Sequence, residues 1–363
     1  MIDGEATRGT NHIRDQRIDG FVSLAGPQVL LDELPLGDDS AEVVVRGRRE
    51  VKEILDHADD RLLVIVGPCS VHDVDAAHEY AERLARKAKE LDDYLCVVMR
   101  VYFEKPRTTT GWKGLINDPA LDDSGDVNSG FLLARRLLLE VLELGLPVGC
   151  EWLDPITPAY ISDLVAWGAI GARTTESQIH RQLASGLSMP IGFKNRTDGN
   201  VDVAVDAVRA AAASHVFTGV DPEGNPAILR TSGNEDCHVI LRGGRGAPNY
   251  APQSIESAVE KLDAAGLPRR VIVDASHDNS GKDHERQPRV ADDIATQVAD
   301  GSTSIVGVML ESFLEAGSQP LGDGKSLVYG QSITDKCMDW DTTVRALDGL
   351  ATAVRARRAP RRR

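Results

Sequence analysis

Short runs of consecutive apolar residues recur along the chain, and each run ends at a charged or metal-ligating residue. The eight runs cover residues 62–66, 95–99, 147–150, 170–172, 190–193, 239–241, 271–276 and 304–310. Unbroken apolar runs are typical of parallel strands that are buried on both faces. Segments with helical periodicity separate most of the runs, so strands and helices alternate. This alternation predicts an α/β fold, a closed (β/α)8 TIM barrel whose functional residues lie at the carboxyl ends of the strands.

Apolar residues that recur every three to four positions predict the helices between these strands. A leading helix is expected over residues 40–57, before the first strand. The others, bounded by glycine or proline, are expected at 74–91, 130–144, 158–167, 176–186, 201–213, 252–265, 289–300 and 340–354.

Three segments fall outside the regular alternation. Residues 1–60 are predicted to form an N-terminal arm and the leading helix, followed by the catalytic barrel over residues 61–350. Within the barrel, residues 214–233 hold two strand-like stretches around a turn rich in proline and glycine, which predicts a β-hairpin inserted before the sixth strand. We expect the hairpin to serve contact or regulation. Residues 351–363 contain six arginines near their end and are expected to form a disordered, solvated tail, with nucleic-acid binding by the tail as the alternative.

Charge and cysteine content narrow the choice of partners and compartment. The 363-residue chain has 41 Lys and Arg against 56 Asp and Glu, a net charge of −15, which disfavours nucleic acid as the main partner. Its five cysteines are odd in number and lack CxxC spacing, so we expect the reducing cytoplasm. The first 20 residues lack the apolar core of a signal peptide, and no apolar run is long enough to cross a membrane.

Four potential metal ligands follow strands that are neighbours in a closed barrel. Cys69 follows the first strand, His277 the seventh, Glu311 the eighth, and Asp335 lies in the loop beyond. Each residue taken singly has a commonplace explanation, as a buried small residue, a hydrogen-bonding group, a helix cap or an ion-pair partner. Together, a thiolate, an imidazole and two carboxylates suit one divalent ion, Mn, Fe, Co, Zn or Cu, better than Mg or Ca.

Basic residues follow several of the same strands. They are Arg100, Lys105, Arg107, Lys113, Arg173, Lys194 and Arg242. Cations that face one cavity repel each other unless anions lie between them. Arginine binds phosphate or carboxylate oxygens through two donors, and lysine adds a point charge. The set predicts two anionic substrates, or one that carries both phosphate and carboxylate. Ordinary ion pairs with the many acids are the alternative for any single residue.

Two loops add donors to this predicted site. In Lys105-Pro106-Arg107-Thr108-Thr109, proline stiffens a loop whose cations and hydroxyls can hold a sugar phosphate. After Arg242, three glycines at positions 243, 244 and 246 could let backbone N–H groups approach a phosphate, although a glycine-rich loop alone is a weak signal.

Several longer motifs resemble one known family. They are Gly67-Pro68-Cys69-Ser70-Val71-His72-Asp73, Met99-Arg100-Val101-Tyr102-Phe103-Glu104 with the loop that follows, Gly111-Trp112-Lys113-Gly114-Leu115, Gly168-Ala169-Ile170-Gly171-Ala172-Arg173-Thr174-Thr175-Glu176-Ser177, Gly192-Phe193-Lys194-Asn195, Leu241-Arg242-Gly243-Gly244 and Ser332-Ile333-Thr334-Asp335. From about residue 17 to about residue 350, the chain resembles type I 3-deoxy-D-arabino-heptulosonate 7-phosphate (DAHP) synthases, in the subgroup regulated by aromatic amino acids.

The resemblance implies a reaction and roles for particular residues. Phosphoenolpyruvate condenses with erythrose 4-phosphate and water to give the heptulosonate phosphate and inorganic phosphate, the first step of the shikimate pathway. Cys69, His277, Glu311 and Asp335 match the metal ligands. Arg100, Lys105, Arg173, Lys194 and Arg242 match the phosphoenolpyruvate site, and Arg107 and Thr108 match the erythrose 4-phosphate site. Glu151 matches an active-site acid. We expect Lys105 to donate a proton to the aldehyde oxygen, with a pKa lowered by neighbouring cations.

The resemblance also implies an effector pocket and an oligomer. The matching positions are Asp15, Pro158, Leu183, Leu187, Ser188, Phe217, Gly219 and Leu229. Gly219 leaves room beside a bound ring, which favours tyrosine over phenylalanine as the inhibitor. The alternative is an unregulated enzyme of a specialised aromatic pathway. A homodimer or homotetramer is expected, with an arm that crosses to the neighbouring subunit.

Other interpretations conflict with specific residues. A sister class that uses arabinose 5-phosphate has a different aldose-binding loop from residues 105–109. A non-catalytic amino-acid sensor would have a broken metal or phosphate site. A metal-dependent amidohydrolase would place a His-x-His pair after the first strand, where this chain has Gly67-Pro68-Cys69.

Overall fold

The computed structural model of the chain describes residues 15–107, 109–322, 324 and 326–359. Eight parallel strands form a closed barrel in the order β1-β10-β9-β8-β5-β4-β3-β2. The ring closes because β1 pairs with both β2 and β10, with Leu62 opposite Leu95 and Leu63 opposite Gly307. The strands are β1 (Leu62–Gly67), β2 (Leu95–Arg100), β3 (Val148–Glu151), β4 (Trp167–Ile170), β5 (Ile191–Lys194), β8 (His238–Leu241), β9 (Val271–Asp274) and β10 (Ile305–Glu311). The predicted (β/α)8 barrel is therefore confirmed.

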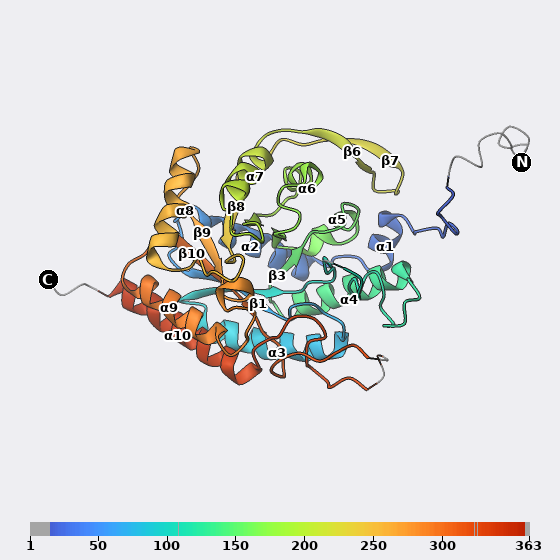
Figure 1. Ribbon diagram of the computed structural model, residues 1–363. Helices are drawn as coiled ribbons and strands as arrows, with labels where there is room; N and C mark the ends of the chain where they lie inside the picture. The colour runs from blue at the N-terminus through green and yellow to red at the C-terminus, as the bar shows by residue number, and fades with distance from the viewer. Residues whose placement is uncertain (1–14, 108, 323, 325, 360–363) are drawn as a thin grey trace, which may run out of the picture.

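Helices surround the barrel on the outside (Figure 1). They are α2 (Asp38–Leu55), α3 (Val74–Leu91), α4 (Val127–Glu143), α5 (Pro158–Ile161) with the 3-10 turn η1 (Ser162–Leu164), α6 (Gln178–Ala184), α7 (Asp202–Ala212), α8 (Pro252–Ala264), α9 (Gln287–Ala299) and α10 (Trp340–Arg358), with a 3-10 turn η2 (His277–Asn279) after β9. Aspartates begin α3, α4 and α10 because their side chains accept backbone N–H bonds of the first turn, as Asp73 does from Ala76 at 3.0 Å.

Residues inside the barrel form a core of their own. Leu63, Ile65, Val98, Ile240 and Ile272 point inward from their strands and are all fully buried. Three residues of α2 at positions 51, 54 and 55 belong to the same cluster. The leading helix therefore packs into the barrel interior, which leaves the carboxyl ends of the strands open for a site.

The inserted hairpin is confirmed and lies apart from the barrel sheet. Strands β6 (Val216–Val220) and β7 (Pro226–Arg230) pair only with each other, antiparallel. Figure 1 shows them arching over α6 and α5 toward α1 (Pro27–Glu33). The turn of the hairpin touches the start of α1, where Gln28 N donates to Pro222 O at 2.8 Å. The arm and the hairpin are thus joined on one side of the molecule.

Two predicted boundaries around the fourth strand are wrong. The fourth strand is Trp167–Ile170 rather than residues 170–172, and the helix before it stops at Leu164 instead of position 167. The apolar run continues without interruption through this region, so its pattern did not locate the transition. Trp167 is buried in the cluster inside the barrel, where its Nε1 donates to His238 Nε2 at 3.2 Å.

Most of the expected disordered tail is helical. Helix α10 continues to Arg358, and the remaining residues 360–363 lie outside the described part of the chain. Ala351 and Val354 are buried, so the apolar face of the helix extends past residue 350. Arg355 and Arg358 stack on the Tyr94 ring, and Arg358 pairs with Asp60. Basic residues in a last turn also interact favourably with the helix dipole. No helix in the described ranges is long and apolar enough to cross a membrane.

Candidate active site

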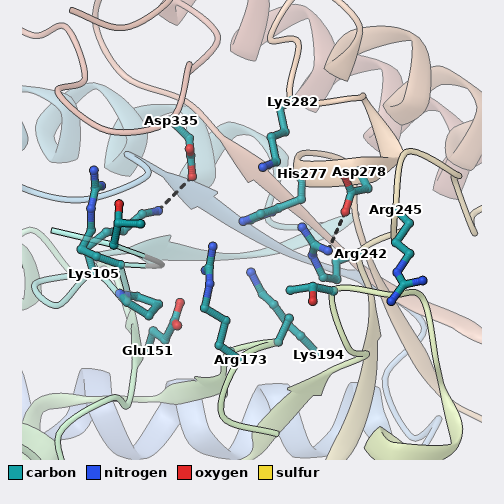
Figure 2. Close-up of a pocket in the computed structure, with 16 residues that line it drawn as sticks. Lys105, Glu151, Arg173, Lys194, Arg242, Arg245, His277, Asp278, Lys282 and Asp335 are labelled. Carbon is teal, nitrogen blue, oxygen red and sulfur yellow. Dashed lines mark hydrogen bonds and ion pairs between the residues drawn. The ribbon is translucent and has the colours of Figure 1, made fainter. Parts of the chain in front are cut away.

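A polar cavity of about 710 Å³ opens at the carboxyl ends of the barrel strands. Its walls include Lys105, Pro106, Arg107, Thr109, Glu151, Gly171, Ala172, Arg173, Lys194, Thr197, Arg242, Arg245, His277, Asp278, Lys282 and Asp335. Figure 2 shows the side chains of His277, Arg173 and Lys194 converging toward the middle of this cavity. The structure therefore gathers at one place residues that the sequence distributes over 230 positions, from Lys105 to Asp335.

Strand ends explain this convergence. Glu151, Lys194 and Glu311 are the last residues of β3, β5 and β10. Arg242 directly follows β8, whereas Arg173 and His277 lie three residues past β4 and β9. Parallel strands in a barrel all end on the same side, so side chains at these positions face a shared space.

Three of the predicted metal ligands form a close cluster. One ligand atom from each of Cys69, Glu311 and Asp335 lies within 4.8 Å of those of the other two. His277 lies at the edge of the cluster, with its Nε2 3.9 Å from Glu311 Oε1. Lys105 is also part of this group, since its Nζ lies 2.6 Å from Cys69 Sγ and 3.1 Å from Asp335 Oδ2. The four predicted ligands are neighbours, and their role in metal binding stays a prediction.

The chemistry of these donors fits a first-row divalent ion. His277 Nδ1 lies 2.9 Å from Asp274 Oδ2 and 2.8 Å from Ser276 Oγ, whose own hydrogen is donated to Asp274 Oδ1. Both neighbours therefore face Nδ1 as acceptors, so Nδ1 carries the hydrogen. The lone pair of the neutral ring is then on Nε2, the atom on the side of Glu311. A metal-binding histidine commonly donates its other N–H to a carboxylate in this way. With a thiol and two carboxylates, the set matches Mn, Fe, Co, Zn or Cu.

Burial and charge shift the pKa values of the cluster. Burial raises the pKa of Cys69 to about 12, helped by Glu311 and opposed by Lys105. Metal uptake would therefore release the thiol proton, and metal affinity would rise with pH. Burial alone would lower the pKa of Lys105, but Cys69, Asp335 and Glu311 outweigh it and raise that pKa above its usual value. The expectation of a lowered Lys105 pKa is wrong for the metal-free protein, because its nearest neighbours are acidic groups rather than cations.

The predicted anion-binding residues divide by depth. Lys194 and Arg242 are almost completely buried in the cavity wall, whereas Arg107 and Arg173 are exposed at its rim. Arg100 is buried behind the cavity, where it donates to Glu311 Oε1 at 2.9 Å and stacks on the Tyr102 ring. The structure does not bring Lys113 into the cavity wall. Thr108 lies outside the described residues.

Buried cations of the site are paired with carboxylates. Lys194 Nζ lies 3.0 Å from Asp274 Oδ2, and Arg242 Nη1 lies 2.7 Å from Asp278 Oδ2. Burial alone would raise the pKa of Asp274, but Lys194 and His277 hold it well below its usual range. Both cations are thus held in place before any anion binds.

Sequence reasoning missed several residues of the site. Arg245 and Lys282 line the cavity, and both have a positive φ, of 47° and 61°. Arg245 lies three residues after Arg242, and Lys282 lies five residues after His277. A search for charged residues a few positions further along these two loops would have found both. Asp274 and Asp278 were missed because they had no signal apart from their proximity to His277.

The glycine-rich loop after Arg242 has a different role from the one expected. The N–H of Gly243 donates to Asn249 Oδ1 at 2.7 Å, and the N–H of Gly244 donates to Ala247 O at 2.9 Å. A side chain on Gly244 would also overlap the backbone of Gly199. These two glycines let the loops after β5 and β8 approach each other, and their N–H groups do not face a phosphate.

The proposed effector positions lie on several separate elements. Leu187 and Ser188 line a cavity of about 860 Å³ between α2 and the base of the hairpin. Phe217, Gly219 and Leu229 lie on the hairpin, where Phe217 pairs with Leu229. Pro158 begins α5, Leu183 is buried on α6, and Asp15 is exposed at the start of the arm. Tyr160 Oη donates to Ala25 O at 2.7 Å, which fixes the arm against α5. A role for these positions in effector binding stays a prediction.

Comparison with known proteins gives consistent matches over nearly the whole chain. The model of the DAHP synthetase I family matches residues 39–348. The chain is 54% identical to the phospho-2-dehydro-3-deoxyheptonate aldolase of Corynebacterium glutamicum, over 95% of each chain. It is 53% identical to the Phe-sensitive enzyme of Escherichia coli K12, over 95% of this chain and 98% of that one. It is 49% identical to the tyrosine-inhibited enzyme of Schizosaccharomyces pombe, over 97% and 96%. The solved structure of the Francisella tularensis aldolase superposes with a TM-score of 0.92 at 49% identity, over 94% of this chain and all of that one.

Proposed function

The chain belongs to the DAHP synthetase I family, and on that premise we propose which of its residues carry out the reaction. It condenses phosphoenolpyruvate with erythrose 4-phosphate and water, the first step of the shikimate pathway. The observation that carries the residue assignment is the 710 Å³ cavity, whose wall holds several cations and reaches, through Asp335, the cluster of Cys69, Glu311 and Asp335. Two small phosphorylated substrates need both the positive charge and the space that this cavity offers.

Phosphoenolpyruvate binds at the buried side of the cavity in this proposal. Lys194 and Arg242, with Arg173 at the rim, neutralise the phosphate of phosphoenolpyruvate. Lys105, which lies beside the metal cluster, binds the carboxylate of phosphoenolpyruvate. Arg100 acts from behind, through its contact with Glu311. Arg107 binds the phosphate of erythrose 4-phosphate at the opposite, exposed end. A divalent ion held by Cys69, His277, Glu311 and Asp335 supplies a Lewis acid for the aldehyde carbonyl.

Side chains of the protein donate and accept the protons that the reaction requires. C3 of phosphoenolpyruvate attacks the aldehyde carbon, and the Lys105 ammonium donates a proton from Nζ to the aldehyde oxygen. Water adds to C2, and its proton passes to a carboxylate. Glu151 is our candidate for this base, because Asp278 and Asp335, the other carboxylates in the cavity wall, are held by Arg242 and Lys105. Phosphate leaves from the resulting hemiketal.

Phosphate release tests this assignment directly. Chelation should abolish release from phosphoenolpyruvate and erythrose 4-phosphate, and Mn²⁺ or another first-row ion should restore it. Cys69→Ala should remove most of the activity and weaken metal binding. Cys96→Ala is the matched control, since that cysteine is equally buried but pairs with Glu50 away from the cavity. Full turnover by protein shown to be metal-free, or a preference for arabinose 5-phosphate, would contradict the proposal.

We also propose feedback inhibition by an aromatic amino acid, with tyrosine favoured. The contact between the hairpin turn and the start of α1, together with the contact of the arm with α5, supports a ligand site built from several separate segments. Ligand binding at such a site could shift the barrel loops between two states. Relatives at about 50% identity are described as Phe-sensitive or tyrosine-inhibited, so overall identity does not decide the effector. Phenylalanine, or no effector at all, remains the alternative outcome.

Two exposed apolar residues of the arm favour an oligomer, and the unpaired cysteines favour a reducing compartment. Phe21 and Val22 of the arm are 82% and 93% exposed, which is unfavourable for an isolated subunit. A homodimer or homotetramer in which the arm meets a neighbouring subunit would cover them. Five cysteines, all unpaired, support a reducing cytoplasm.

A further inference from the structure

One buried carboxylate touches both halves of the proposed site. Asp274 is the last residue of β9 and has no exposed surface. Its Oδ2 atom lies 3.0 Å from Lys194 Nζ, on the phosphate side, and 2.9 Å from His277 Nδ1, on the metal side. Its other oxygen, Oδ1, accepts from Ser276 N at 3.0 Å and from Ser276 Oγ at 2.5 Å. Asp274 is thereby fixed in position, with one oxygen shared between two functional groups.

We propose that Asp274 is a positioning residue that makes binding of the metal and binding of phosphoenolpyruvate reinforce each other. The proposal rests on the proposed function, because it takes His277 as a metal ligand and Lys194 as a phosphate ligand. Asp274 itself touches neither the metal nor the substrate and acts through these two side chains.

Sharing of a single oxygen determines the sign of the coupling. A metal on His277 Nε2 draws electron density from the ring, so Nδ1–H becomes more positive and its attraction to Asp274 Oδ2, 2.9 Å away, becomes stronger. Asp274 then neutralises Lys194 less, and more of the Lys194 charge is available to phosphate. In the other direction, a phosphate bound to Lys194 neutralises its charge, so Asp274 interacts more strongly with His277 Nδ1. The ring then becomes more electron-rich, and His277 Nε2 becomes a better metal ligand. The two effects are equal in free energy because linkage between two ligands is reciprocal.

Burial strengthens the electrostatic interaction between Lys194 and Asp274. Lys194 and Asp274 are 3% and 0% exposed, so water cannot replace either partner and the interaction is poorly screened. The second ion pair of the cavity, Arg242 with Asp278, has the same type of charge but does not touch His277. It therefore serves as an internal control within the same anion site.

The test compares Asp274→Asn with Asp278→Asn in the full-length protein. Mn²⁺ affinity is measured by competition with a chromophoric chelator, and phosphoenolpyruvate affinity by calorimetry with and without Mn²⁺. Asp274→Asn should weaken Mn²⁺ binding by about 10- to 100-fold. It should also strengthen phosphoenolpyruvate binding to the metal-free protein, so the gain in affinity caused by Mn²⁺ should shrink. Asp278→Asn should keep both the wild-type Mn²⁺ affinity and the wild-type gain.

Opposite changes in the two affinities distinguish coupling from structural damage. If Asp274→Asn lowers both affinities together, or leaves the Mn²⁺-dependent gain intact, the proposal is wrong. If Asp274→Asn does not fold, Lys194→Met provides the test. Without Lys194, the Asp274 carboxylate interacts only with His277 of the two, so Mn²⁺ binding should become tighter. Arg242→Met, which removes the same charge without touching Asp274, controls for simple electrostatics, and an equal effect of both variants would overturn the coupling. Phosphate release by the wild-type protein reports separately on the proposed function.

Discussion

Glu104 makes the stability of this protein depend on pH near neutrality. It immediately precedes Lys105 and is 3% exposed, and its carboxyl accepts from the N–H groups of Leu153 and Asp154 at 3.4 and 3.2 Å. A hydrogen bond with Thr157 adds to these contacts. Burial, and secondarily the charge of Asp154, raises the pKa of Glu104 from its usual 4.5 to about 8. The residue thus connects the substrate loop after β2 to the loop after β3 as a neutral acid.

The sign of the pH effect follows from proton counts. Between pH 4.5 and 8 the folded protein keeps a proton on Glu104 that the unfolded chain has released. Stability from this group is therefore complete below pH 4.5 and is lost as the pH rises toward 8. Each pH unit is worth about 1.4 kcal/mol for one proton, so the loss over the whole interval is roughly 3–5 kcal/mol.

Replacing Glu104 by glutamine should remove this dependence. Glutamine has no charge to desolvate. It keeps only one oxygen, so it can accept from Leu153 N or from Asp154 N but not from both, and this loss is the same at every pH. Urea unfolding at several values between pH 5 and 9 should show the variant gaining on the wild type by about 1.4 kcal/mol per pH unit up to pH 8. Glu143→Gln, at an exposed position on α4, should follow the wild type throughout. Parallel stability curves for wild type and Glu104→Gln would refute the reasoning, because they would mean that Glu104 is charged in the folded protein.

Two further predictions concern substrate and effector. Arg107→Ala should raise KM for erythrose 4-phosphate by roughly 10- to 100-fold, the value of a charged hydrogen bond of about 1.5–3 kcal/mol, and leave KM for phosphoenolpyruvate nearly unchanged. Lys113→Ala, outside the cavity, is its control, and steady-state kinetics with each substrate varied would expose an equal effect on both. Gly219→Ser should weaken tyrosine inhibition and spare kcat, because the new Cβ would come within 2.6 Å of Leu229 Cδ1 and displace that side chain. Ile228→Ser, on the exposed face of the hairpin, should leave inhibition intact, and calorimetry that detects no binding of tyrosine, phenylalanine or tryptophan to the wild type would contradict effector binding.

Much of the architecture was predictable because strands and helices leave recognisable patterns of apolar residues in the local sequence. Buried parallel strands have unbroken apolar runs, so seven of the eight barrel strands were predicted to within two residues, and the fourth was displaced. Helix α3 was predicted to the residue, Val74–Leu91, since Asp73 marks its start and apolar residues recur along one face. The errors occurred where the local pattern was ambiguous. The apolar stretch that contains Trp167 did not show where helix ended and strand began, and the arginines after Val354 concealed a helix that packing against Tyr94 and Asp60 extends.

The amino-acid sequence alone is enough to predict which residues reach the mouth of the barrel. Every parallel strand ends on the same side, so a charge at a strand end, such as Lys194 or Glu311, must face the shared cavity. Which of these charges are in contact depends on the three-dimensional arrangement of the strands and loops. Asp274 looked like one more residue of an apolar strand, yet its oxygen lies within 3.0 Å of Lys194 and 2.9 Å of His277. Lys105 was expected among cations and instead lies between a thiol and a carboxylate. Ion pairing and pKa depend on separations of a few ångströms and on burial, and a periodic pattern along the chain does not specify either.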